Sequence, residues 1–392
     1  MKRKPVNSSR TPIYRDAGFE LFDADTTKDA FTRETENERI PDLYIYSRYR
    51  NPTVVAAEEE ILNLEGCNWA LLTQTGMSAI DTALSVFQKG ELTGPWLFFS
   101  EIYGGTISFI DSVLRKRRGL QIQSFNPVDE KYDLREFEKV IGKIRPEVIY
   151  IEAISNPMLI VTDVEHVVRL AHKYGSKVIV DNTFATPELY KPLEDGADLV
   201  IHSATKYFSG HGNITAGVVC GNDTSLMKAA IEYRKFVGHM ISPDDAYRLN
   251  TQIQTFKLRF REQCSNAARI VRMFNNQAVI RKIWYPGLPD HPTHKDALKL
   301  FGDRGFGAMI TVDFAGRTEI EKKRNRDGFI KAVSEKIKII PSLGDPKTIL
   351  MPVESVWGAK YPEPGMIRLS VGFENYNELE KTILEALDIT GR

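Results

Sequence analysis

Short apolar segments alternate with amphipathic helical patterns between about residues 70 and 220, and this alternation constrains the fold more than any other feature. Helical patterns begin at Gly76 and cover Ile107–Arg118 and Val164–Tyr174. The expected strands are Ala70–Thr73, Trp96–Ser100, Val148–Glu152, Lys177–Asp181, Ala197–His202 and Thr215–Cys220. Strands that are apolar throughout are buried on both faces, and intervening helices allow parallel pairing. The predicted fold class is therefore α/β, with a mostly parallel central sheet covered by helices.

The chain has 392 residues, a length sufficient for two domains. Its patterning divides it into three expected regions. Residues 1–55 are polar without sustained periodicity, which predicts an extended arm. Residues 56–250 form the large domain and residues 251–392 a smaller C-terminal α+β domain, with the charged helical stretch 225–275 as their link. Three later segments alternate like antiparallel strands with one solvent-facing side. These segments are Ala308–Phe314, Lys336–Ile340 and Met366–Val371, and a helix over Tyr376–Leu387 follows.

Charge and cysteine content exclude several classes of protein. The chain has 52 Lys and Arg residues and 52 Asp and Glu residues, so its formal net charge is zero. This balance argues against a general nucleic-acid or anionic-membrane binder. Cys67, Cys220 and Cys264 are far apart and lack metal-ligand spacing. We therefore predict no disulfide framework, no metal site, no membrane span, and a cytoplasmic location.

Two polar residues at strand ends point to a cofactor. The strand Lys177–Asp181 ends on a carboxylate, and Lys206 follows the next strand, directly after the hydroxyl-bearing residues Ser203 and Thr205. Pyridoxal 5'-phosphate (PLP) enzymes need a lysine for a Schiff base, a carboxylate for the pyridinium nitrogen, and donors for the phosphate. The carboxyl ends of strands in open α/β sheets form ligand crevices. The competing interpretations are a surface lysine and a helix-capping or turn aspartate.

Further residues could complete such a site. Gly76 begins a helix whose free amides suit a phosphate, although such turns are common as plain connections. Tyr103 could stack on a flat ring and act as a general acid, or be a loop tyrosine. Arg48 could bind a phosphate, or be solvated. Arg368 lies in an expected strand and could clamp a substrate carboxylate, with an internal salt bridge as the alternative.

Taken together, these motifs resemble the cystathionine γ-synthase-like family of trans-sulfuration PLP enzymes, which act in Cys and Met metabolism. The resemblance runs from Tyr46 to Leu387. It is carried by Tyr46–Thr53, Gly76–Met77, Tyr103–Thr106, Asn156–Pro157, Asp181–Phe184, Ser203–Lys206, Ser342–Gly344 and Arg368–Gly372.

The resemblance implies the type I PLP-dependent transferase fold, which is that of aspartate aminotransferase, and a homotetramer of two active dimers. In such enzymes Lys206 would carry PLP, Asp181 would bind the ring nitrogen and Asn156 would contact the 3′ oxygen. Tyr103 would stack on the ring and assist proton transfer. Arg368 and Ser342 would bind the substrate carboxylate. The implied phosphate-binding residues are Gly76, Met77, Ser203 and Thr205, with Tyr46 and Arg48 reaching over from a neighbouring subunit.

The departures from the family lie around the expected substrate site. Methionine γ-lyases typically have Cys at the position of Gly105, and many cystathionine γ-lyases have Glu at that of Pro341. The loop 345–355 also differs. We favour a C–S γ-lyase that yields 2-oxobutanoate and ammonia. The alternatives are a γ-replacement synthase using homoserine esters, a cystathionine β-lyase, an aminotransferase on the same fold, and a non-enzymatic relative.

Overall fold

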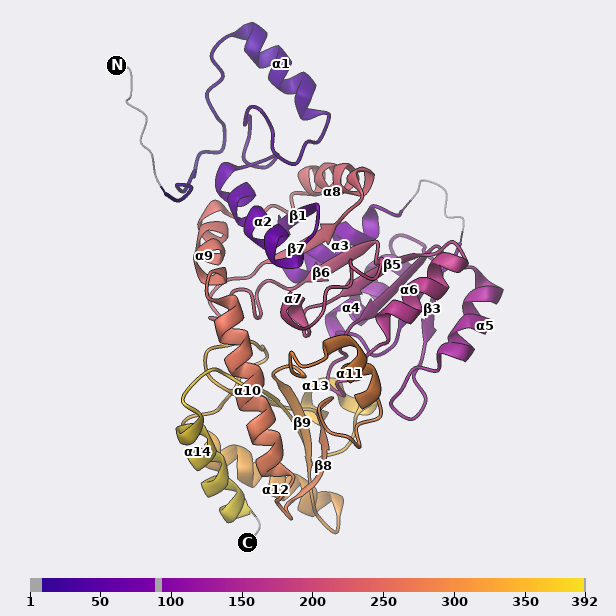
Figure 1. Ribbon diagram of the computed structural model, residues 1–392, viewed down its shortest axis with the longest axis vertical. Coiled ribbons are helices and arrows are strands. Elements are labelled where there is room, and N and C mark those ends of the chain that lie inside the picture. The colour runs from indigo at the N-terminus through magenta and orange to yellow at the C-terminus, as the bar shows by residue number, and fades with distance from the viewer. Residues whose placement is uncertain (1–8, 89–93, 391–392) are drawn as a thin grey trace.

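Two β-sheets organise the molecule. The computed structural model describes residues 9–88 and 94–390, and within these ranges a seven-stranded and a five-stranded sheet are each packed with helices (Figure 1). The larger sheet has the order β1-β7-β6-β5-β4-β2-β3, and only β7 runs antiparallel to its neighbours. Its strands are β1 (Trp69–Thr73), β2 (Trp96–Phe99), β3 (Ile122–Phe125), β4 (Val148–Glu152), β5 (Lys177–Asp181), β6 (Leu199–His202) and β7 (Gly217–Gly221). The predicted mostly parallel sheet is confirmed.

Both faces of the larger sheet are buried, which explains its uniformly apolar strands. In β4, Ile149 and Ile151 join one hydrophobic cluster, while Val148 and Tyr150 join another on the opposite face. Helices α2 (Pro52–Glu65), α5 (Leu134–Ile144) and α6 (Val164–Lys173) cover the first face. Helices α3 (Gly76–Ser85) and α8 (Thr224–Val237) cover the second. The helix expected over 107–118 is instead α4 (Gly104–Phe109) continued by the π-helix η1 (Ile110–Arg115).

The smaller sheet has the order β10-β11-β12-β9-β8 and is antiparallel except between β10 and β11. Its strands are β8 (Ile280–Trp284), β9 (Met309–Phe314), β10 (Lys338–Ile339), β11 (Ile349–Pro352) and β12 (Met366–Ser370). The prediction that one side of β9 and of β12 faces solvent is wrong. Thr311, Asp313 and Arg368 are buried, and the Thr311 hydroxyl donates to the Pro157 carbonyl oxygen at 2.6 Å. Their polar face lies against the larger sheet's half of the molecule.

The remaining helices connect and cover the two sheets. They are α7 (Thr186–Leu189), α9 (Pro243–Ile253), α10 (Phe256–Phe274), α11 (His294–Phe301), α12 (Glu319–Val333), α13 (Glu354–Trp357), the 3-10 helix η2 (Gly358–Lys360) and α14 (Tyr376–Thr390). Of the expected linking stretch 225–275, only α10 runs between the two cores. Phe256 and Phe260 pack in the large core, while Ile270 and Phe274 pack in the small one. The domain boundary near residue 250 remains a prediction.

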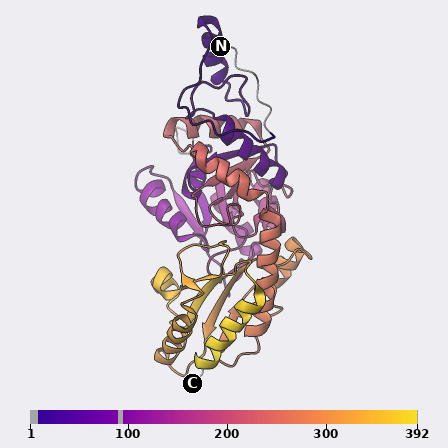
Figure 2. The same ribbon diagram turned by 90° about the vertical axis from the view of Figure 1, so that its left-hand side faces the viewer.

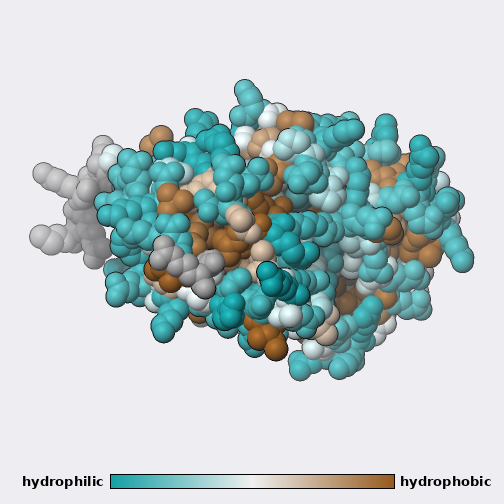
Figure 3. All heavy atoms as spheres, turned by 90° about the horizontal axis from the view of Figure 1, so that it is seen from below, coloured by the Kyte–Doolittle hydropathy of each residue, from teal (hydrophilic) through white to brown (hydrophobic). Residues whose placement is uncertain are grey.

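The N-terminal arm projects beyond the larger sheet (Figures 1 and 2). Within the predicted arm, Ala24–Glu34 forms α1, which is capped by the Asp23 carboxylate accepting from the Thr26 amide at 2.7 Å. At the opposite end, the molecule presents a mainly hydrophilic face with smaller hydrophobic patches (Figure 3). Across residues 9–88 and 94–390, no helix has the length and apolar character to cross a membrane.

Candidate active site

A cavity of about 240 Å³ lies where the strand ends of the larger sheet meet the polar face of β12. Glu152 and Asp181, the last residues of β4 and β5, line it together with Lys206, which follows β6. Arg368 of β12 lines the opposite wall. The carboxyl edge of an α/β sheet is the expected place for a ligand crevice. The structure therefore brings the predicted lysine, aspartate and arginine together.

Lys206 presents a mostly buried amine to the cavity. Its Nζ atom donates to the Ser342 hydroxyl at 3.1 Å. Burial and then the nearby Arg368 guanidinium lower the pKa of Lys206, while Asp345 opposes them. Burial disfavours a charged amine, and a like charge does the same. The interpretation as a solvated surface lysine does not fit this environment.

Asp181 is a buried acid held by three donors. Its Oδ1 atom accepts from the Thr183 amide at 3.0 Å and the Thr183 hydroxyl at 2.6 Å, and its Oδ2 atom accepts from the Tyr150 hydroxyl at 3.2 Å. Burial raises the pKa of Asp181, and the Thr183 bonds act against this rise. The Thr183 hydroxyl also accepts from the Ser203 amide at 2.9 Å, so Asp181 and the segment leading to Lys206 are held together.

Glu152 is a cavity residue that the sequence analysis missed. It pairs in register with Asp181, and its Oε1 atom accepts from the Tyr103 amide at 2.5 Å. Burial, followed by the charge of Asp181, raises the pKa of Glu152 well above its ordinary value. The same signal that identified Asp181, an acid closing an apolar strand, was present in Val148–Glu152. Glu152 therefore forms a buried pair of carboxyl groups with Asp181.

The start of α3 and the segment before Lys206 form a cradle. Gly76, Met77, Ser203 and Thr205 all line the cavity. A Cβ atom at position 76 would lie 2.9 Å from the Ser203 hydroxyl oxygen, so glycine leaves this space open. The Gly76 and Met77 amides belong to the first helical turn, where the helix itself supplies no acceptor. These donors suit a phosphate group.

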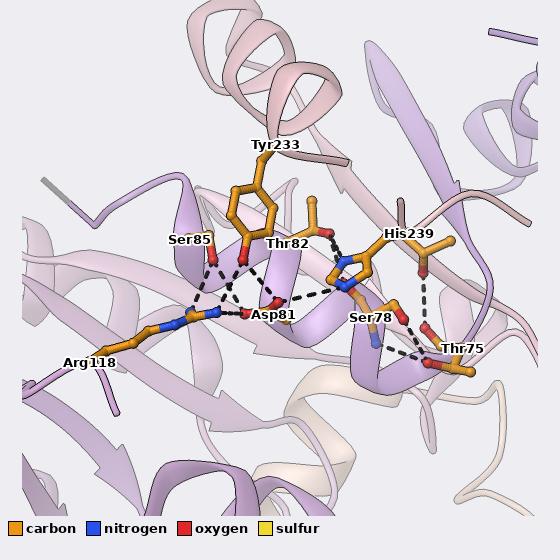
Figure 4. A network of polar contacts seen from close by, with 9 residues as sticks. Thr75, Ser78, Asp81, Thr82, Ser85, Arg118, Tyr233 and His239 are labelled. Carbon is orange, nitrogen blue, oxygen red and sulfur yellow. Dashed lines mark hydrogen bonds and ion pairs between the residues drawn. The ribbon is translucent and has the colours of Figure 1, made fainter. Parts of the chain in front are cut away.

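A polar network behind the cradle fixes α3 (Figure 4). The Thr75 hydroxyl caps α3 by accepting from the Ser78 amide at 3.0 Å. On the same helix, Asp81 forms an ion pair with Arg118 at 2.7 Å and accepts from the Tyr233 hydroxyl at 3.0 Å. The His239 carbonyl oxygen accepts from the Gln74 amide at 3.2 Å. The amides at the start of α3 are thus presented from a rigid support.

Arg368 is buried with free hydrogen-bonding capacity. Its Nη1 atom donates to Asn156 Oδ1 at 3.0 Å, and its Nη2 atom donates to the Ser342 carbonyl oxygen at 2.9 Å. Its Nε atom has no partner in the described part of the chain. Burial lowers the pKa of Arg368 to about 10. Neither hydrogen-bond acceptor is a carboxylate, so the alternative of an internal salt bridge is not supported, and the group is available to an incoming anion.

Of the predicted residues Tyr103, Tyr46 and Arg48, only Tyr103 lies at the cavity. Tyr103 lines the cavity and is half exposed. A Cβ atom at Gly105 would overlap the Tyr103 ring, so any side chain there would displace it. Tyr46 and Arg48 do not line the cavity. Arg48 donates to the Lys235 carbonyl oxygen at 2.6 Å and stacks over the Tyr49 ring at 4.9 Å.

Comparison with known proteins gives the family of the chain. The Cys/Met metabolism PLP-dependent enzyme family matches residues 1–388. An L-methionine γ-lyase of Porphyromonas gingivalis is 32% identical over 96% of this chain and 92% of its own length. A cystathionine β-lyase of Lactococcus lactis subsp. cremoris is 33% identical over 89% of each chain. A crystal structure of cystathionine γ-synthase from Xanthomonas oryzae pv. oryzae, in complex with cystathionine, is 26% identical with a TM-score of 0.83, covering 97% of this chain and 93% of that one.

The chain belongs to the Cys/Met metabolism PLP-dependent enzymes. Its fold is the type I PLP-dependent transferase fold, its cofactor is PLP, and it is an enzyme. The cavity fits this cofactor, because the open space at Gly76, the buried acid and a lysine amine with a lowered pKa share it. Within the described ranges, no cluster of three or more His, Cys, Asp or Glu side chains is arranged to hold a metal ion.

Proposed function

We propose that the protein is a carbon–sulfur lyase that acts at Cγ of a sulfur amino acid and releases 2-oxobutanoate and ammonia. The observation that carries this proposal is the character of the cavity walls. Arg368 and Lys206 are the cationic side chains among the described lining residues, and apolar residues surround them. The apolar members are Met77, Ile80, Ile154, Phe184, Pro341 and Leu343. One carboxylate partner beside an apolar wall suits an α-amino acid with a thioether side chain.

The cofactor would be held by residues from both sides of the cavity. Lys206 would bond to it covalently, Asp181 would bind the ring nitrogen, Asn156 would contact the 3′ oxygen, and Tyr103 would stack on the ring. When bound, PLP supplies a conjugated ring that takes up the electrons left on removal of a Cα proton. The phosphate ligands within the subunit would be Gly76, Met77, Ser203 and Thr205.

The chain's own groups would bind the substrate and move protons. Arg368 would hold the α-carboxylate through its in-plane donors, with Ser342 beside it. The Lys206 amine would remove the Cα proton, because its lowered pKa favours the neutral base. The Tyr103 hydroxyl would assist proton transfer at the departing sulfur. Asp181 would keep a negative charge at the ring nitrogen, stabilised by the Thr183 donors.

A substrate panel tests the reaction. Purified holoenzyme is incubated with methionine and with cystathionine, and 2-oxobutanoate, pyruvate and ammonia are quantified. We expect 2-oxobutanoate and ammonia from at least one of them. Release of pyruvate from cystathionine would instead establish a β-lyase. Thioether formation from acetyl- or succinyl-homoserine with sulfide or cysteine, without lyase products, would establish the synthase alternative, to which the similarity with cystathionine γ-synthase points.

We also propose a homotetramer built from two active dimers, in which Tyr46 and Arg48 reach a neighbouring subunit's phosphate site. The position of both residues outside the cavity of their own subunit supports this arrangement. A cytoplasmic location is supported by the free, buried thiols of Cys67, Cys220 and Cys264. The division into an arm over 1–55, a large domain over 56–250 and a small domain over 251–392 likewise stands as a proposal.

A further inference from the structure

The chain between β11 and β12 crosses from the smaller sheet to the loop that carries Tyr103. This stretch, residues 354–361, contains α13 and η2, and we call it the 354–361 segment. One end is held by Glu354, which pairs with Arg326 of α12 at 3.0 Å. The other end is held by Lys360 and Tyr361. The segment thus bridges the two sides of the cavity.

The far end is fastened to the buried Glu101. Lys360 Nζ forms an ion pair with Glu101 Oε1 at 3.0 Å and donates to the Ser100 carbonyl oxygen at 2.9 Å. The Tyr361 hydroxyl donates to the second carboxylate oxygen of Glu101. Glu101 is itself anchored, because its amide donates to the Tyr132 hydroxyl at 3.0 Å. Glu101 lies two residues before Tyr103, so these contacts join the 354–361 segment to the loop that carries Tyr103.

Between these two attachments, Trp357 lies over Arg368. The Arg368 Cζ atom is 5.5 Å from the centroid of the Trp357 ring, and Trp357 packs against the large hydrophobic core. A ring on the face of a guanidinium attracts the cation without using its in-plane donors. Trp357 therefore covers one face of Arg368 and leaves the in-plane donors available to a carboxylate, including the Nε atom that is unpartnered within the described residues.

We propose that Trp357 is a positioning residue that fixes the plane of Arg368 for the α-carboxylate of the amino-acid substrate, and that Lys360, Tyr361 and Glu101 hold Trp357 in place. This inference rests on the proposed role of Arg368. It does not depend on whether the reaction is a γ-lyase, a β-lyase or a synthase, because every such substrate carries the same carboxylate.

Glycine is the probe that isolates carboxylate recognition, because it has no side chain. It is titrated into holoenzyme, and its apparent Kd is read from the absorbance of the bound cofactor. Trp357→Leu should raise this Kd about three- to tenfold, and Trp357→Phe should recover most of the loss. Lys360→Met should also raise the glycine Kd. The Trp357→Leu/Lys360→Met double variant should bind glycine no more weakly than Trp357→Leu alone, since both changes undo one arrangement. With the best substrate, KM should rise while kcat changes less than about twofold.

Lys381→Met is the matched control, because Lys381 forms an exposed pair with Glu385 on α14, away from the cavity. It should leave the glycine Kd unchanged. An unchanged Kd in Trp357→Leu and Trp357→Phe, or fully additive effects with Lys360→Met, would overturn the inference. If Trp357→Leu fails to fold, Lys360→Met decides, and an unchanged glycine Kd in that variant would overturn the inference. Arg368→Lys distinguishes a failure of this inference from a failure of the proposed role of Arg368. An unchanged glycine Kd in that variant would refute the carboxylate-binding role of Arg368 itself.

Discussion

At the scale of single residues, the unusual feature is a pair of carboxyl groups at the ends of adjacent strands. Glu152 and Asp181 are register partners, both are buried, and both line the cavity. Two like charges so close cannot both ionise without a large cost. Asp181 has donors from Thr183 and Tyr150, whereas Glu152 accepts from the Tyr103 amide. We infer that Asp181 is the ionised member and that Glu152 stays neutral.

The first prediction concerns Glu152. Glu152→Gln retains an oxygen that can accept from the Tyr103 amide, so kcat and cofactor affinity should remain within a few-fold of wild type. Glu152→Ala leaves that amide unpaired in a buried site, and kcat should fall about 10- to 100-fold. Steady-state kinetics and PLP titration of the apoenzyme measure both effects. Equal losses in the two variants would show that the carboxyl group itself is required.

The same residue predicts a pH dependence. The folded-state pKa of Glu152 is raised, so its contribution to stability is complete below its unfolded pKa of about 4.3 and is lost as pH rises through the folded value. Urea unfolding of the apoenzyme should therefore show that Glu152→Gln gains stability relative to wild type as pH increases from 5 to 8. A constant difference across this range would contradict the raised pKa.

Much of the site could be predicted from sequence because its residues follow a local rule. Asp181, Lys206 and Gly76 each lie where a strand ends or a helix begins, and such positions are visible in the chain. The partnership between Arg368 and Asn156 is not, because 212 residues separate them and only the packing of the two sheets brings them together. Trp357 could not be found either, since a single aromatic residue at the end of a four-residue helix carries no pattern.

At the scale of elements, a buried ionic cluster joins four parts of the chain. Glu58 of α2 pairs with Arg234 of α8 at 2.8 Å and with Arg50 at the end of the arm at 3.0 Å. Its Oε1 atom also accepts from the Leu72 amide of β1 at 2.9 Å. All three charged side chains are at most 3% exposed, and burial lowers the pKa of Arg234 to about 10. The cluster fixes α2 and α8 against the edge of the sheet.

Arg234→Met should lower the free energy of unfolding by about 2–4 kcal/mol, because it leaves a buried carboxylate with fewer partners. Lys228→Met is the control on the same helix, since Lys228 is 43% exposed and lies 3.6 Å from Glu38. It should change stability by less than about 1 kcal/mol. Urea titrations of both variants make the comparison. Similar losses in both would show that the buried cluster contributes no more than a surface ion pair.

Elements with a simple periodicity are predictable from sequence, and elements defined by tertiary packing are not. The strands β4 and β5 are confirmed residue for residue, because both faces are buried. The edge strand β3 was not predicted, since Gln123 and Ser124 are exposed and its apolar signal is weak. In β9 and β12 the alternation was correctly recognised as strand, but the polar side is buried rather than solvated, and in β12 it brings Arg368 to the cavity. Sequence alternation alone cannot tell a solvated face from a functional one.

At the scale of the whole molecule, the cavity is assembled from both sheets. The larger sheet supplies the strand-end residues, the smaller sheet supplies Arg368, and α10 runs through both cores. The arm carries Tyr46 and Arg48 away from the cavity of its own subunit. A cofactor phosphate bound by both residues therefore requires a second copy of the chain, and closed two-fold symmetry would complete two sites at once.

Subunit mixing tests this shared site. Arg48→Ala and Lys206→Ala should each be inactive, but a dimer containing one of each has one site with both residues intact. Random exchange makes about half of the dimers mixed and restores one site in each, so activity should approach about one quarter of wild type. Mixing Arg48→Ala with the Arg48→Ala/Lys206→Ala double variant is the control and should restore nothing, because no site then contains both residues. A fully active monomer in sedimentation, or no recovery after verified exchange, would show that each subunit builds its site alone.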